Sequence, residues 1–216
     1  NLRTKPIYIK IRQLIRDGEL GAIQRIQWTG THWFRTEAYY RSGNWRATWA
    51  GEGGGVLLNQ CPHQLDLWYW LFGMPCRVRG FCRLGRYHDI EVEDDETAYM
   101  EYENGMTGTF ITASGEFPGT NRLEIAAERG RLIADNDSTL HFIRNEEPIS
   151  EFSKTTTEIW GKPDTWEVTI PAGGEGEQHI GILKNFVSAC LQGKPLIAPA
   201  EEGIYSVELA NAMLYS

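Results

Sequence analysis

Long apolar runs, clustered positive charge and paired cysteines are all missing from this sequence of 216 residues. No apolar run approaches the roughly 18 residues of a membrane-spanning helix, so such a helix is excluded. The formal net charge is -8 and no lysine and arginine cluster occurs, which makes nucleic acid and anionic membranes poor partners. The four cysteines contain no C-x-x-C pair, and we expect reduced thiols in a cytoplasmic protein.

Nucleotide-binding loops and internal repeats are missing too. No G-x-G-x-x-G follows an expected strand, and no Walker loop occurs. No signal peptide opens the chain. The sequence begins with Asn1 rather than Met and stops within an expected helix over Glu201–Ser216. We therefore expect this chain to be part of a longer protein.

The residues that are present indicate a single folded α+β domain over residues 1–216. A hydrophobic content of 41% and an aromatic content of 12% favour a packed core over disorder. Apolar residues at helical spacing predict helices over Pro6–Arg16 (with Thr4 as the candidate N-cap), Pro62–Phe72, Ile180–Leu191 and Glu201–Ser216. Because proline is unfavourable deep inside a helix, Pro62 predicts a helix boundary or kink between Asn59 and His63.

The middle of the chain is predicted to be β-structure throughout residues 77–170. Alternating residues and tight turns predict strands over Thr97–Tyr102, Met106–Ala113, Arg122–Ala127, Arg131–Ala134, Thr139–Ile143 and Trp166–Ile170. An earlier strand is expected over Ala22–Phe34, followed by a loop with short helical pieces over Arg35–Trp49. The prediction is a large, mostly antiparallel open sheet of about six to nine strands with helices packed on one face.

The most informative stretch runs from Gly51 to Asp66. Three consecutive glycines are followed by three apolar residues, and then by Asn59, His63 and Asp66. His63 has an unperturbed pKa of about 6.5, so it is the candidate general acid or base. Asp66 lies three residues on along the same helical face and is predicted to orient the imidazole. The structural alternative is a helix-terminus histidine that is simply hydrogen-bonded to Asp66.

A second group combines aromatic and arginine side chains. Aromatic faces stack on sugar rings, and guanidinium groups bind hydroxyls or carboxylates. The candidate substrate-binding residues are Arg35, Tyr39, Trp45 and Arg46. A lid or interface that packs on the domain would explain the same composition.

Two other chemistries are weakly supported. The acidic run from His88 to Asp95 lacks HExxH and EF-hand spacing, so we assign no metal site and interpret it as a solvated turn that leads into a strand. His141 and His179 could each reach a cleft. A nucleophilic pair of Cys61 with His63 has no further support in the sequence.

The run Gly53–Asp66, followed by Trp70–Gly73, resembles the substrate-domain motif of the Gfo/Idh/MocA oxidoreductases, a family that includes glucose–fructose oxidoreductase and inositol dehydrogenase. The resemblance covers nearly the whole chain. It continues at Asn1-Leu2-Arg3, Pro6, Gly18–Gly21, Glu103–Gly105, Gly130–Leu132, Asn185-Phe186 and Glu201–Gly203.

The resemblance implies a two-domain enzyme. An N-terminal Rossmann domain would bind NAD or NADP, and this C-terminal domain would form the sugar or polyol site and the oligomer interface. Carried over, His63 is the acid/base, Asn59 positions the substrate, and Gly54 and Gly55 allow the backbone to approach substrate and cofactor. The E-K-P lysine of the Rossmann domain has no counterpart here. Without that domain we expect the chain to be inactive, because hydride transfer needs a positioned nicotinamide.

The chain departs from the family at Asn59, where a carboxylate is common. An amide removes a possible proton acceptor, so redox chemistry depends more strongly on His63. Two alternatives remain: a non-catalytic sugar-sensing or regulatory protein on a dehydrogenase scaffold, and a glycosidase-type enzyme that oxidises transiently through bound NAD. We also predict a homodimer or tetramer through the open sheet face, if that face is apolar.

Overall fold

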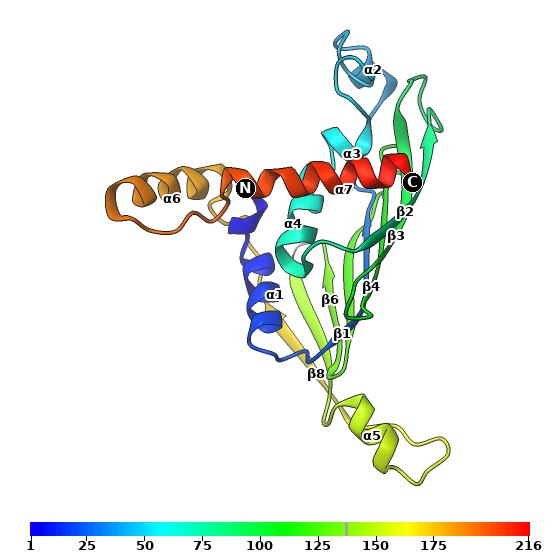
Figure 1. The fold of residues 1–216 in the computed structure, drawn as a ribbon, viewed down its shortest axis with the longest axis vertical. Helices are drawn as coiled ribbons and strands as arrows, with labels where there is room; N and C mark the ends of the chain where they lie inside the picture. The colour runs from blue at the N-terminus through cyan, green and yellow to red at the C-terminus, as the bar shows by residue number, and fades with distance from the viewer. Residues whose placement is uncertain (137) are drawn as a thin grey trace.

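The computed structural model describes residues 1–136 and 138–216 (Figure 1). The helices are η1 (Leu2–Thr4), α1 (Pro6–Arg16), α2 (Glu37–Tyr40), α3 (Val56–Asn59), α4 (Pro62–Phe72), α5 (Ile149–Thr155), α6 (Gln178–Gln192), η2 (Ala200–Glu202) and α7 (Gly203–Tyr215). The strands are β1 (Ile23–Gly30), β2 (Arg77–Leu84), β3 (Glu93–Glu101), β4 (Thr107–Ala113), β5 (Asn121–Ala127), β6 (Gly130–Asp135), β7 (Thr139–Asn145) and β8 (Thr165–Pro171).

One open sheet of eight strands organises the fold, in the order β2-β3-β4-β1-β5-β6-β7-β8. Strand β1 pairs parallel with β4, and the other neighbouring strands pair antiparallel. Helices α1, α4 and α7 lie on one side of this sheet (Figure 1). The predicted α+β fold with a mostly antiparallel open sheet is confirmed.

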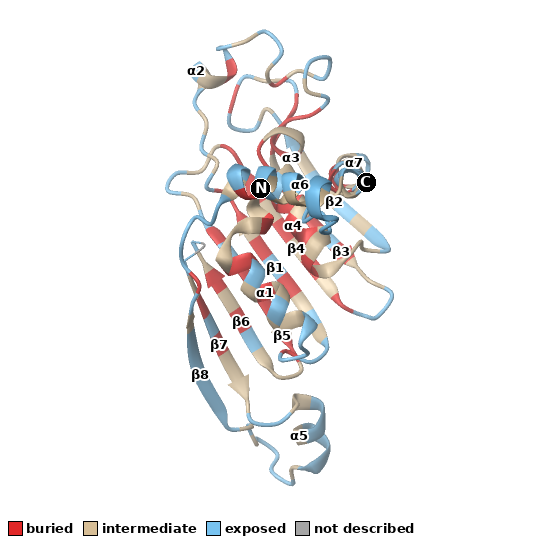
Figure 2. Ribbon diagram, turned by 90° about the vertical axis from the view of Figure 1, so that its left-hand side faces the viewer, coloured by how far each residue is buried: buried red, intermediate tan, exposed pale blue. Residues whose placement is uncertain are grey.

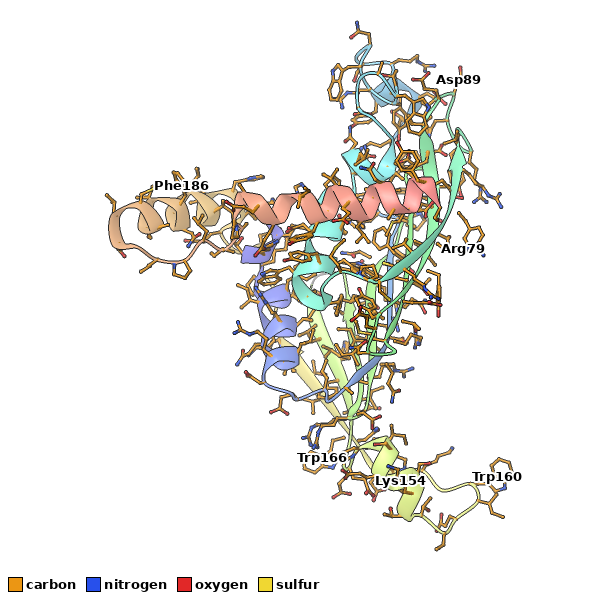
Figure 3. The ribbon with its side chains drawn as sticks, in the orientation of Figure 1. Arg79, Asp89, Lys154, Trp160, Trp166 and Phe186 are labelled. Carbon is orange, nitrogen blue, oxygen red and sulfur yellow. The ribbon has the colours of Figure 1, made fainter. Side chains whose placement is uncertain are left out.

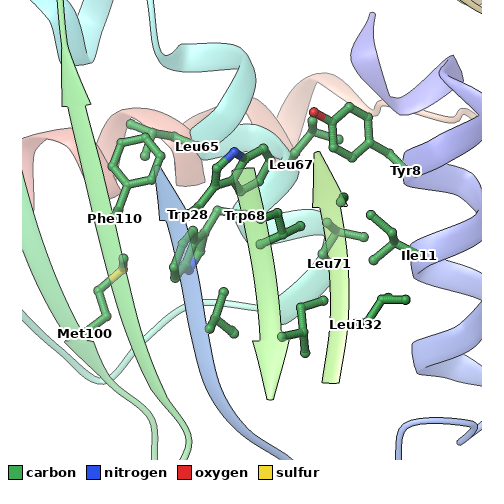
Figure 4. Close-up of a cluster of buried hydrophobic side chains, with 14 of the residues drawn as sticks. Tyr8, Ile11, Trp28, Leu65, Leu67, Trp68, Leu71, Met100, Phe110 and Leu132 are labelled. Atoms are coloured by element: carbon green, nitrogen blue, oxygen red, sulfur yellow. The ribbon is translucent and has the colours of Figure 1, made fainter. Parts of the chain in front are cut away.

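The core lies between the sheet and the helices α1, α4 and α7. Trp28 of β1 stacks on Trp68 of α4 with their ring centroids 6.5 Å apart, and Phe110 of β4 meets Trp68 edge-on at 5.9 Å (Figure 4). Gly108 makes room for this packing, because a Cβ there would lie 2.5 Å from the Trp68 ring. This aromatic cluster fixes α4, and therefore the start of α4 at Pro62, against the centre of the sheet.

The break expected between Asn59 and His63 is confirmed. Helix α3 ends at Asn59, and α4 begins at Pro62, which occupies a first-turn position where its missing N–H is harmless. Asn59 therefore lies at a helix C-terminus and His63 at a helix N-terminus, on either side of a two-residue joint. The two candidate catalytic residues are therefore four positions apart in the sequence, one on each side of this joint.

Three local predictions need correction. Thr4 is not the N-cap of α1, because Lys5 occupies that position and the Thr4 hydroxyl donates to the Asn1 carbonyl within η1. The stretch 77–170 is not β-structure throughout, since α5 lies within it; no residue of α5 is buried, so its sequence carries little apolar periodicity. The strand expected over Ala22–Phe34 is only Ile23–Gly30.

The acidic run leads into strand β3 as predicted, with Asp89 and Glu91 exposed in the turn, but its last part is not solvated. Glu93 and Asp94 are both fully buried. The Glu93 carboxylate accepts hydrogen bonds from the backbone N–H groups of Gly55, at 2.7 Å, and Leu57, at 3.0 Å, and so caps the start of α3. Because helix N-terminal N–H groups lack partners within the helix, a carboxylate can be buried against them. Sequence composition alone cannot distinguish such capping from a solvated turn.

The open face of the sheet is mixed rather than apolar. Phe81 and Tyr99 are exposed on this face, with exposed fractions of 62% and 42%. Ion pairs lie on the same face farther along the sheet, on β1, β5 and β6, including Arg25 with Glu124 at 2.5 Å and Arg122 with Asp135 at 2.9 Å. The predicted self-association required an apolar open face, and this face is only partly apolar. A dimer through this face stays a prediction that light scattering can test.

The helices α5 and α6 and the edge strand β8 are largely uncovered (Figures 1 and 2). The helix α6 extends away from the sheet and exposes Leu183 and Phe186, and β8 exposes Trp166 (Figure 3). Among the described residues, no helix has both the length and the apolar character needed to cross a membrane.

Glu96 is a buried carboxylate whose titration should destabilise the fold as pH rises. Neither of its oxygens accepts a well-formed hydrogen bond from the described residues, and the neighbouring Cys82 thiol and Phe81 backbone only partly offset the cost of burial. Burial raises the pKa of Glu96 to about 7. A group with a raised pKa in the folded state stabilises the fold below its unfolded pKa of about 4.3. That stability is lost as pH rises through 7.

The Glu96→Gln variant should therefore have a higher free energy of unfolding than the wild type at pH 8, by about 2–3 kcal/mol, and a similar one at pH 4. Urea unfolding across this pH range measures the difference. Wild-type and variant curves that run parallel from pH 4 to 8 would contradict the burial argument.

Candidate active site

Asn59 is at the centre of a hydrogen-bonded group at the end of α3. Its Oδ1 accepts a hydrogen bond from Gln60 Nε2 at 3.1 Å and lies 3.5 Å from the Tyr39 hydroxyl, which donates to it. The same Tyr39 oxygen accepts from Arg46 Nη1 at 2.9 Å. The structure therefore brings Asn59 together with two of the predicted substrate-binding residues.

The other two predicted substrate-binding residues pack on the same group. The Arg46 guanidinium lies 4.6 Å from the centroid of the Tyr39 ring and 4.3 Å from that of the Trp45 ring. The Arg35 guanidinium lies 5.1 Å from the centroid of the same Tyr39 ring. Trp45 keeps 49% of its surface exposed. The four residues form one surface of cations and aromatic faces beside Asn59, which we call the aromatic–arginine cluster.

Glu52 belongs to this group and was missed by the sequence analysis. Asn59 Nδ2 donates to Glu52 Oε1, and Glu52 Oε2 accepts from the backbone N–H of Ala47 at 2.6 Å. Because a carboxylate only accepts, it fixes the amide with Nδ2 toward Glu52 and Oδ1 toward Tyr39. In place of the carboxylate that the resemblance implies at position 59, this chain has an amide that donates a hydrogen bond to the carboxylate of Glu52. The sequence signal was weak: one acidic residue between Gly51 and Gly53.

The glycines before α3 have a packing role. A Cβ on Gly55 would lie 1.9 Å from the backbone oxygen of Glu93, and one on Gly54 would lie 2.9 Å from the Leu58 side chain. Only glycine lets the start of α3 approach β3 this closely. That approach places Asn59 at the far end of the short helix. The predicted role of Gly54 and Gly55 toward substrate and cofactor stays a prediction.

His63 projects from the first turn of α4 and is exposed. Partial burial of the ring lowers its pKa below the usual 6.5, and the positive N-terminus of Asn1 lowers it further. Asp66 opposes this shift, and His179 reinforces it. No hydrogen bond to the His63 ring occurs among the described residues. At neutral pH the ring is a neutral, accessible proton acceptor.

Asp66 is committed to another partner. Its two oxygens accept from Arg3 Nε at 2.9 Å and Nη2 at 2.5 Å, and Arg3 also donates to Glu202. Arg3 is only 2% exposed. Among the described residues, no hydrogen bond joins Asp66 to His63, so Asp66 acts on the imidazole through its charge. The ion pairs fasten η1 to α4 and η2 beside the candidate site.

The remaining candidates do not assemble into a second site. His179, at the start of α6, lies 3.3 Å from Asn1 Nδ2, and His141 is exposed on β7. Burial raises the pKa of Cys61 to about 12, and its thiol lies 3.0 Å from the Thr112 hydroxyl, so it is no nucleophile. Within the described part of the chain, no group of three or more histidine, cysteine or acidic residues could hold a metal ion. A hollow between α1, α4 and α6, which includes Arg12 and Trp70, is not lined by His63 or Asn59.

Comparison with known families identifies the domain. The family model for the GFO/IDH/MocA C-terminal domain matches residues 8–133. The chain belongs to this family. The match includes the whole stretch from the aromatic–arginine cluster to His63, and it confirms the resemblance that the motif indicated. No curated protein matches the chain.

Solved structures share the fold. The WlbA dehydrogenase of Chromobacterium violaceum, in complex with NADH and UDP-GlcNAcA, is 23% identical with a TM-score of 0.78, and the match covers 98% of this chain and 57% of that chain. A levoglucosan dehydrogenase in complex with NADH and levoglucosan is 17% identical with a TM-score of 0.74, and the match covers 98% of this chain and 60% of that chain. The biliverdin reductase of Synechocystis sp. PCC 6803, in complex with biliverdin and NADP+, is 20% identical with a TM-score of 0.73. That match covers 97% of this chain and 59% of the reductase chain. This chain thus spans less than two thirds of each of these chains.

Proposed function

We propose that this chain is the substrate domain of an NAD(P)-dependent oxidoreductase that acts on a sugar, a polyol or a related hydroxylated compound. The observation that carries the proposal is the family's motif folded around a joint between two helices, with Asn59 on one side and an accessible, neutral His63 on the other. The adjoining aromatic–arginine cluster has the chemistry to bind a sugar. Relatives of the same fold bind NADH with UDP-GlcNAcA or levoglucosan.

The cofactor would be held mainly by a nucleotide-binding domain outside this chain. The sequence has no dinucleotide fingerprint, and it spans 57% of the WlbA chain that binds NADH. When bound, the nicotinamide supplies the hydride acceptor or donor. We therefore propose that the chain is inactive without that domain.

In the oxidation direction, His63 accepts the proton of the reacting hydroxyl. Asn59 Oδ1 accepts a hydrogen bond from the same substrate in place of the long contact from the Tyr39 hydroxyl, and Glu52 keeps the amide oxygen on that side. Tyr39 and the arginines bind the remaining hydroxyl or acidic groups. Because Asn59 cannot take a proton and the Glu52 carboxylate already accepts from Asn59 and the Ala47 N–H, we assign His63 as the proton acceptor.

Asn59 also supports a second candidate, a sugar-sensing protein that binds without chemistry. The two candidates differ in one assay. The protein that carries this chain and its nucleotide-binding domain is mixed with NAD+ or NADP+ and a panel of polyols, aldoses and nucleotide sugars, and reduced nicotinamide is followed by absorbance. We expect substrate-dependent reduction, and none with residues 1–216 alone. Binding by calorimetry without any nicotinamide reduction would favour the sensor.

A further inference from the structure

His88 is a buried histidine outside the candidate active site, held between two hydrogen-bond acceptors. Its side chain lies in the turn before β3 and is 8% exposed. Nδ1 lies 2.9 Å from Asp94 Oδ2, and Nε2 lies 2.8 Å from the backbone oxygen of Arg35. The Tyr40 ring covers one side, with its centroid 4.8 Å from that of the imidazole.

Both partners of the ring can only accept. The Asp94 carboxylate already accepts the backbone N–H groups of Arg86 and Tyr87, each at 2.8 Å, and that of His88 at 3.0 Å. Oδ2, the oxygen that faces the ring, accepts two of these three N–H groups, so it offers the ring an acceptor. The Arg35 oxygen is a peptide carbonyl and has no proton to give. A neutral imidazole has only one N–H, so it would leave a lone pair facing an acceptor at one of the two contacts.

The fragment held by His88 carries the aromatic–arginine cluster. The Arg35 carbonyl binds His88, and the Arg35 N–H donates to the Ser114 oxygen at 2.8 Å. The Tyr40 hydroxyl lies 2.8 Å from the Ser114 hydroxyl, and the Ser114 N–H donates to the Asp94 carbonyl at 3.0 Å. The segment that positions Arg35 and Tyr39 is therefore anchored to the end of the sheet through His88 with Asp94 and through Ser114.

We propose that His88 is a positioning residue, doubly protonated in the folded protein, that clamps the Arg35 backbone to Asp94. The clamp and the Ser114 contacts together hold the segment that carries the aromatic–arginine cluster against the end of the sheet. The clamp itself follows from the geometry alone, and its effect on substrate binding rests on the proposed function.

The charged groups around the ring agree with a cationic His88. Asp94 of β3 is the carboxylate in contact with it. Arg86 is engaged with Asp95 at 2.5 Å, and Glu37 of α2 accepts from the Asp89 N–H at 2.9 Å, so these groups face other partners. Asp89 and α2 lie together at one end of the molecule (Figures 1 and 3). The Tyr40 ring also packs on the imidazole, and burial raises the pKa of the Tyr40 hydroxyl to about 12, so Tyr40 stays neutral.

The direct test is the imidazole nitrogen spectrum of the protein labelled with ¹⁵N-histidine, with the His88 signals identified by their loss in His88→Leu. Both ring nitrogens should show the shifts of protonated nitrogens at pH 7. A shift of the unprotonated type at either nitrogen would overturn the proposal. This test does not depend on any enzymatic activity.

A second test links the clamp to the site. In the protein with its nucleotide-binding domain, His88→Leu should raise KM about 10- to 100-fold with a smaller change in kcat, since a misplaced cluster binds substrate poorly. The matched control is His141→Leu, at an exposed histidine on β7, for which we expect wild-type kinetics. An unchanged KM in a folded His88→Leu protein whose wild type turns over would refute the clamp's role. Absence of turnover in the wild type would instead refute the proposed function and leave the nitrogen spectrum as the test of the clamp.

Discussion

A His63→Ala variant of the protein with its nucleotide-binding domain should turn over its substrate about 10²- to 10⁴-fold more slowly than the wild type, which is the usual contribution of a general base. The other two polar residues of the motif do not replace it. Asn59 is an amide, and Asp66 is held by Arg3. Steady-state kinetics measure the loss, with His141→Ala as a control at an exposed histidine remote from the joint.

The pH dependence of kcat/KM gives an independent test of His63 as the proton acceptor. As the proton acceptor, His63 must be neutral, and burial together with the nearby positive charge lowers its pKa. In the oxidation direction, kcat/KM should therefore be flat at neutral pH and fall with an acid limb centred below pH 6.5. His63→Ala should lack this limb. Undiminished activity in His63→Ala would show that the proton goes elsewhere.

Arg3→Ala should lower the free energy of unfolding by about 3–5 kcal/mol, because it leaves two carboxylates without their buried cation. Arg3 is nearly inaccessible, and it binds Asp66 with two donors and Glu202 with a third. These contacts join η1, α4 and η2, segments that are far apart in the sequence. Urea unfolding of variant and wild type measures the difference.

The control for Arg3→Ala is Arg79→Ala, at an exposed arginine on β2. Surface substitutions of this kind usually change stability by less than about 0.5 kcal/mol. Equal stabilities of the two variants would mean that the Arg3 ion pairs contribute nothing net, as some buried pairs do when desolvation offsets attraction.

The parts of the fold with local signals could be predicted from the sequence. Helices α1 and α4 have apolar residues at helical spacing, and Pro62 marked the joint. The parallel pairing of β1 with β4 could not be predicted, because it joins strands separated by about 80 residues that share no local pattern. The helix α5 was missed because it buries no residue and therefore lacks a periodic apolar face.

The site residues also divide into those with a local sequence signal and those whose role depends on tertiary contacts. The motif placed Asn59 and His63 at the joint, and composition selected the members of the aromatic–arginine cluster. Glu52 and His88 were not selected, because their significance lies in partners supplied by the fold: the Asn59 amide and the Arg35 carbonyl. Asp94 and Glu93 were misinterpreted as solvated for the same reason, since each is buried against backbone N–H groups. Tertiary hydrogen bonds, rather than residue types, decide these cases.

The central claim is that this domain presents a hydroxylated carbon to a nicotinamide, with His63 taking the proton. The most direct measurement uses a substrate found in the nicotinamide assay, deuterated at the carbon that bears the reacting hydroxyl, and follows the label by mass spectrometry. We predict that the deuterium appears in the reduced cofactor, at a rate that falls sharply in His63→Ala. A label that stays on its carbon while the protein binds or converts the compound would contradict hydride transfer and the function proposed for this domain.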